Sequence, residues 1–120
     1  MQRIFTQTYH VPGTLAADLG IRFTVPTDCQ LVHVSAVGSN TYAAGLELGT
    51  SADADAYLEK CSIGVSGTPV EKGRSNFVGS QYPHITDGTI FVITLDYNYN
   101  GGGAANASAN FTIVLTFTEG

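Results

Sequence analysis

The segment NFTIVLTFTE, residues 110–119, decides the fold. Its apolar and polar side chains alternate: Phe111, Ile113, Leu115 and Phe117 share one face, and Thr112, Thr116 and Thr118 share the other. Alternation of period two is typical of a β-strand with one buried face. A second strand is predicted at residues 89–98, where residues 90–95 are apolar on both faces. A strand covered on both faces beside one covered on a single face indicates two packed sheets.

Further strands are predicted on the N-terminal side of these two, each ended by glycine or proline. They span residues 3–11, 20–25, 30–37, 42–48 and 61–65. Within residues 30–37 the alternation places Val32, Val34 and Ala36 on one face and Leu31, His33, Ser35 and Val37 on the other. Residues 50–60 change period, because Thr50 and Asp53 have capping-box spacing and alanines follow. This segment is predicted to form one short helix.

About eight short strands with one helix and many glycine and proline turns indicate an all-β fold. We expect an antiparallel β-sandwich, jelly-roll-like, that occupies residues 1–120 as one domain. The glycine-rich residues 99–109 are expected to form an exposed, mobile loop. That loop is expected to join residues 89–98 and 110–119 as a paired antiparallel hairpin at the centre of the fold.

The composition narrows the classes of partner. Charged residues make up 12% of the chain, about half the usual share, and ten acids against five bases give a net charge of −5. Nucleic-acid binding is therefore not expected. No run of 18 apolar residues and no N-terminal export signal is visible, so neither membrane insertion nor export is expected. The weakly charged surface, with Leu31, Val37 and Val92 as apolar strand residues beyond one core, favours a homo-oligomer.

No catalytic, cofactor-binding or metal-binding residue is predicted, and no enzyme activity is expected. His10, His33 and His84 lack a partner at nucleophile or metal-ligand spacing. His33 could approach Asp28 or Cys29, but we expect it to be a hydrogen-bonded core residue. The acids Asp53, Asp55 and Glu59 are better explained as residues of a helix's first turn than as calcium ligands. Cys29 and Cys61 are expected to be free thiols rather than a disulfide.

Three other features have a weak functional interpretation. Gly101, Gly102 and Gly103 follow a strand without opening a helix, so they lack the setting of a phosphate-binding loop. Asn106 and Asn110 begin glycosylation sequons, which matter only in a secreted eukaryotic protein. The tyrosines and amides at 97–100 form an aromatic tip that could contact a sugar or a neighbouring protein. A plain exposed loop is the simpler interpretation of that tip.

Several phrases of the sequence, in this order along the chain, resemble the head decoration or cement proteins of tailed bacteriophages. The phrases are FTVP (23–26), LVHVSA (31–36), GTSADADAY (49–57), GTPV (67–70) and FTEG (117–120). The resemblance covers most of the chain and implies a virion structural protein, made in the bacterial host cytoplasm, that binds the outside of the capsid and stabilises it. It implies the major capsid protein as partner and a homotrimer as the oligomeric state, with no cofactor. It carries no binding residues position by position.

Two other function classes remain as alternatives. A carbohydrate- or receptor-binding jelly roll of a phage fibre would use Tyr42, Tyr97 or Tyr99 to stack on sugar rings. A cupin-type enzyme would need clustered histidine and glutamate ligands, which the sequence lacks. Binding to empty capsids rather than to a glycan array separates the first two classes.

Overall fold

A computed structural model describes residues 3–99 and 106–120. Its strands are β1 (Ile4–Thr14), β2 (Leu19–Thr24), β3 (Cys29–Val37), β4 (Gly45–Thr50), β5 (Leu58–Ser62), β6 (Val70–Lys72), β7 (His84–Ile85), β8 (Ile90–Asp96) and β9 (Ala109–Glu119). Two single-turn 3₁₀ helices, η1 (Arg74–Asn76) and η2 (Val78–Ser80), lie between β6 and β7. Within the described ranges no helix is long and apolar enough to cross a membrane.

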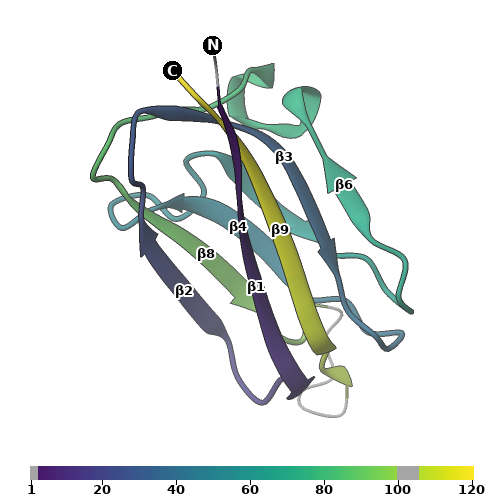
Figure 1. Ribbon diagram of the computed structural model, residues 1–120. Coiled ribbons are helices and arrows are strands. Elements are labelled where there is room, and N and C mark those ends of the chain that lie inside the picture. The colour runs from purple at the N-terminus through teal and green to yellow at the C-terminus, as the bar shows by residue number, and fades with distance from the viewer. Residues whose placement is uncertain (1–2, 100–105) are drawn as a thin grey trace.

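The strands form two antiparallel sheets that pack face to face (Figure 1). Sheet A has the order β1-β9-β3-β6, with the short β7 also paired to β3, and sheet B has the order β2-β8-β4-β5. Strands that follow each other in the chain, such as β1 and β2 or β8 and β9, mostly lie in opposite sheets. This strand order is that of a jelly roll, so the predicted fold class is confirmed.

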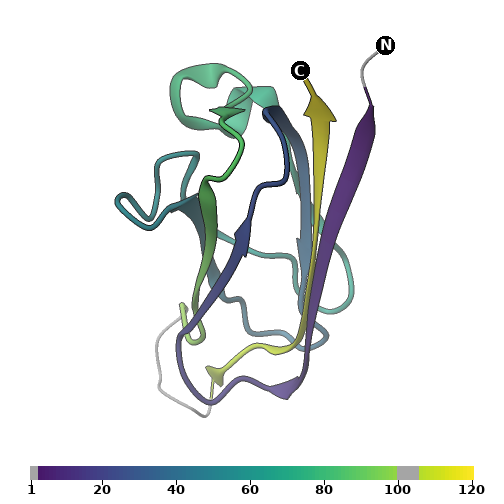
Figure 2. The same ribbon diagram turned by 60° about the vertical axis from the view of Figure 1, so that its left-hand side comes forward.

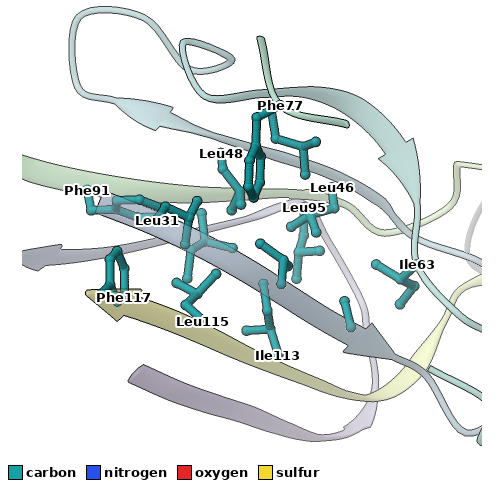
Figure 3. Packing of buried hydrophobic residues seen from close by; sticks show 14 of the residues in the cluster. Leu31, Leu46, Leu48, Ile63, Phe77, Phe91, Leu95, Ile113, Leu115 and Phe117 are labelled. Atoms are coloured by element: carbon teal, nitrogen blue, oxygen red, sulfur yellow. The ribbon is translucent and has the colours of Figure 1, made fainter. Parts of the chain in front are cut away.

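The core fills the space between the sheets (Figure 3). Sheet A contributes the inward side chains of β9, from Phe111 to Phe117, which are fully buried as the alternation predicted. Sheet B contributes Phe91, Ile93 and Leu95 from β8, which are also fully buried. At about 1.5–3 kcal/mol for each large apolar side chain, these two central strands supply much of the driving force for folding.

The predicted hairpin between the last two strands is wrong. β8 pairs with β2 and β4 in sheet B, whereas β9 pairs with β1 and β3 in sheet A. Both strands are central, as expected, but each already has two neighbours in its own sheet. The connection from Asp96 to Ala109 therefore crosses between the sheets, and it is much longer than the two to five residues usual for a hairpin.

The predicted helix at residues 50–60 is also absent. The Asp53 amide donates to the Thr50 hydroxyl, as the capping pattern predicted, but the Thr50 amide donates back to the Asp53 carbonyl and closes a turn. Leu58, the first residue of β5, pairs with Leu48 of β4 and is buried in the core. Burial of Leu58 in the sheet thus prevails over the local helix signal.

The faces of β3 differ from the predicted alternation. A bulge between Leu31 and His33 adds one residue to the strand, so Leu31 points inward together with Val34 and Ala36. A bulge adds one residue to a strand, so residues with odd numbers face the core on one side of it and residues with even numbers face the core on the other. Leu31 is consequently core, and it does not belong to any apolar surface that could hold a second copy.

The irregular segment between β6 and β7 closes one side of the sandwich. Phe77, between the two 3₁₀ turns, is buried and packs in the core beside Leu48 (Figure 3). Burial of Phe77 therefore fixes this segment to the core.

Candidate binding face

The outer surface of sheet A is rich in threonine and poor in charge. We call it the threonine face; its outward positions, on β1, β9 and β3, are Ile4, Thr6, Thr8, His10, Thr112, Val114, Thr116, Thr118, Gln30, His33, Ser35 and Val37. Each β9 threonine or valine in this set lies between one residue of β1 and one of β3, for example Thr116 between Thr6 and His33. β-Branched side chains at such paired positions form an even, stiff surface.

All three histidines of the chain lie on this face or at its rim. His10 Nδ1 is 2.8 Å from the Thr112 hydroxyl oxygen, and His84 Nε2 is 2.6 Å from the Gln30 side-chain nitrogen. His33 Nε2 is 3.1 Å from the Glu71 carboxylate. His33 is therefore not a core residue near Asp28 or Cys29, because its side chain is 40% exposed and its partner is on β6.

The two outer surfaces of the sandwich differ in the number of charged side chains. Among the described outward positions on the paired strands of sheet A, Glu71 is the only acid or base outside the histidines. Sheet B has Arg22, Glu47 and Asp96 at outward positions, and Lys60 Nζ lies 3.4 Å from the Asp96 carboxylate. A partner that covers sheet B would have to desolvate these charges, whereas a partner on the threonine face covers mainly hydroxyl and methyl groups.

The three tyrosines proposed for sugar stacking do not form one surface. The Tyr97 ring packs partly buried against the core, and its amide donates to the Asp18 carboxylate. Tyr99 lies against Gly45, with Lys60 Nζ 5.9 Å from its ring centre. Tyr42 and Tyr99 keep 36% and 40% of their surface exposed. Two of these rings therefore already have intramolecular partners.

The remaining candidate residues lie apart from the threonine face. Asp53 and Asp55 are in the turn after β4, where a side-chain hydrogen bond to the Asp53 carboxylate favours protonated Asp55 and raises the pKa of Asp55. Among the described residues no group of three possible ligands is close enough to hold a metal ion. Cys29 and Cys61 are free thiols, with Cys29 buried and Cys61 half-buried, and burial raises the pKa of both. Asn100 and the glycines at 101–103 lie outside the described residues.

The second sequon asparagine has a structural role. Asn110 adopts a positive φ of 51°, its side-chain oxygen accepts from the Gly13 amide, and its side-chain nitrogen donates to the Ser39 hydroxyl. It joins the ends of β1 and β3 at the start of β9, next to the irregularity between Val11 and Thr14. Ser108, two residues before Asn110 in the chain, is fully buried.

The threonine face could not be located from sequence because its residues come from three strands that are distant in the chain. The sequence does contain a sign of this face. The outward positions of β9 are almost all threonine, and β1 has Thr6 and Thr8 at alternate positions. Only the pairing of β1 and β3 on either side of β9 brings these rows together.

Comparison with known proteins shows a likeness of fold. No protein-family model matches the sequence. No curated protein matches it either. Among solved structures, a chain of the "Cyanophage Pam1 capsid asymmetric unit" is similar, with a TM-score of 0.61 and 14% sequence identity over 99% of this chain and 85% of that one. At this identity the likeness establishes that almost the whole chain shares its fold with a chain of a phage capsid.

Proposed function

We propose that the protein is a virion structural protein of a tailed bacteriophage, a decoration or cement protein that binds the outside of the capsid and stabilises it. The observation that carries the proposal is the fold: nearly the full length matches a chain of a phage capsid asymmetric unit. The resemblance of the sequence to decoration proteins points to the same class independently. In this proposal the protein is not an enzyme and works by contact alone.

The threonine face is the surface that we propose meets the major capsid protein. It is one side of a five-stranded sheet, and covering it costs little desolvation because Glu71, beside it on β6, is the one acid among the described outward positions of that sheet. Hydroxyl groups on an even surface can exchange water for polar groups of the shell. Each contact is weak, but many copies bound to one shell sum to a large stabilisation.

We further propose that the protein is a homo-oligomer on the shell, with a trimer as the state that the resemblance implies. Apolar and hydroxyl contacts would hold it together, so its association should depend only weakly on salt. Val37, on the threonine face, remains a candidate for this contact. Leu31 and Val92 do not, because both are buried within one copy.

The test compares binding of two lysine variants to capsids that lack the protein. Thr116→Lys puts a charge in the middle of the threonine face, and Thr94→Lys is its matched control, since Thr94 is an outward, half-buried threonine on β8, the central strand of sheet B. We expect wild type and Thr94→Lys to sediment with capsids and to raise the temperature at which they release DNA. Thr116→Lys should do neither.

The outcomes separate two levels of the proposal. Failure of the wild-type protein to bind capsids would refute the virion function. Equal binding of both lysine variants would keep the function but remove the threonine face as the contact. Binding to a glycan array in place of capsids would favour the fibre-module alternative, in which the exposed Tyr42 and Tyr99 are the residues to replace.

A further inference from the structure

The free edge of β1 differs from every other described sheet edge. β1 is the outermost strand of sheet A and has a strand partner on one side only, β9 (Figure 1). It is 11 residues long, Ile4–Thr14, and over that described length it contains no Asp, Glu, Lys or Arg. Its first proline is Pro12, near the end of the strand.

The other outer strands are short, and all of them except the two-residue β7 (His84–Ile85) contain charged residues. β2 has six residues and includes Arg22, β5 has five and includes Glu59 and Lys60, and β6 has three and includes Glu71 and Lys72. Short length and charged side chains, lysine above all, are the usual protections of a sheet edge against pairing with another chain. β1 has neither protection.

Apolar side chains along this edge are incompletely covered. Phe5, Tyr9 and Val11 point inward from β1 and pack against the core, yet all three are only partly buried. In the other sheet, Phe23 on β2 is also partly buried, and its ring centre is 5.9 Å from that of Tyr9. Ile4 is 70% exposed. Figure 2 shows β1 at the outer margin of the sandwich.

We propose that β1 pairs antiparallel with β1 of a second copy, about a two-fold axis through Gln7. This contact would join the two A sheets into one continuous sheet. Residues directly opposite in antiparallel strands point to the same side of the sheet, so the alternation of β1 restricts the register. Centring the pair on Gln7 keeps the outward residues outward and the core-facing residues inward.

This register matches β1 with itself. It sets Phe5 opposite Tyr9 of the second copy and Thr6 opposite Thr8 of the second copy, with Gln7 opposite its own equivalent. Aromatic pairs and threonine pairs are among the stabilising cross-strand combinations. Because β1 has no charged residue, no like charges meet although each copy has a net charge of −5.

The size of the contact predicts a weak dimer in free solution. The eight residues before Pro12 extend for about 27 Å, and the sandwich is about 10 Å deep between its sheets. The strip covered on each copy is then roughly 270 Å² in projection, well below the roughly 800 Å² per partner of a standard stable interface. The contact goes beyond the proposed function, because it belongs to the protein alone and needs no capsid.

Cysteine cross-linking tests the register. Gln7→Cys, made with Cys61→Ala to remove the half-buried thiol, places two thiols opposite each other at the axis. The Cα atoms of directly paired residues are about 4.5–5.5 Å apart, within the range of a disulfide. We expect a disulfide-linked dimer whose rate of formation rises with protein concentration and exceeds at least ten-fold that of Thr24→Cys, an exposed control on the β2 edge. Equal rates would overturn the proposal.

Sedimentation equilibrium tests the contact without a new thiol. Wild type should reach a monomer–dimer equilibrium at protein concentrations of hundreds of micromolar. Gln7→Lys should remain monomeric, since the axis would bring two ammonium groups together, while Thr24→Lys should dimerise like wild type. A wild-type protein that stays monomeric throughout, or a Gln7→Lys variant that dimerises equally, would overturn the proposal. Melting curves check that each variant is folded.

Discussion

Replacing Phe117 by alanine should destabilise the protein more than most single substitutions. Phe117 is fully buried at the inner face of β9. Its ring stacks on Phe5 at 5.0 Å between centres and meets Phe91 and Phe23 edge-on at 5.8 and 6.2 Å. These neighbours come from three other strands in both sheets, so removal of the ring leaves a cavity that no single strand can fill by a local shift.

The expected cost follows from that packing. A buried phenylalanine replaced by alanine loses about 3–5 kcal/mol, through lost burial and the cavity that remains. This is a large share of the roughly 5–15 kcal/mol that holds a typical domain folded. At about 4 °C per kcal/mol for a chain of this size, the melting temperature should fall by about 12–20 °C.

Chemical denaturation and thermal melts of Phe117→Ala beside Thr116→Ala provide the assay. Thr116 is the next residue along β9 but faces outward, so its replacement should change the free energy of unfolding by less than about 1 kcal/mol. A double-mutant cycle with Phe91→Ala should give a coupling of about 0.5–1.5 kcal/mol for the aromatic pair. Equal losses for Phe117→Ala and Thr116→Ala would refute the assigned faces of β9.

Three further predictions concern the turn after β4, the buried thiol and assembly. Gly49→Ala should lower the melting temperature, because a Cβ added at Gly49 would clash with the Asp53 carbonyl oxygen. Gly20→Ala should leave the melting temperature unchanged or slightly raised, because a Cβ added there meets nothing within 4 Å. Equal melting temperatures of the two variants would contradict the close approach of the turn to Gly49. Burial raises the pKa of Cys29, so the thiol ionises at lower pH in the unfolded chain than in the folded protein, and the free energy of unfolding should fall as the pH rises above about 9. If Cys29→Ala loses stability equally at alkaline pH, this thiol does not cause the loss. Light scattering of the protein at a concentration where it associates should give nearly the same average mass at low and high salt, whereas dissociation at high salt would indicate ion pairs.

Much of the fold could be predicted because alternation in β9, β1 and β2 reports directly on which face is buried. Phe111, Ile113 and Phe117 lie where the pattern put them. The exceptions have physical causes. A single-residue bulge in β3 turned Leu31 inward, and bulges leave little trace in hydrophobic pattern. The capping hydrogen bond at Thr50 formed, but it closed a turn because Leu58 is held in the sheet.

The pairing of strands and the binding face were less accessible. Residues 90–96 and 109–119 are neighbours among the elements of the chain, which favours a hairpin, but two central strands of opposite sheets cannot also pair with each other. The threonine face and the uncharged edge of β1 both depend on which strand lies beside which. A surface of this kind has no local motif, so it emerges only when the order of the strands is known.

A cryo-EM map of the virion to which we propose that the protein belongs tests the central claim most directly. We predict that the β-sandwich lies on the outer surface of the capsid, with the threonine face, centred on Thr116 and Val114, against the shell. The charged face of sheet B should then point toward solvent. A map without the sandwich on the capsid would contradict the proposed function. A map in which sheet B meets the shell would contradict the assigned binding face.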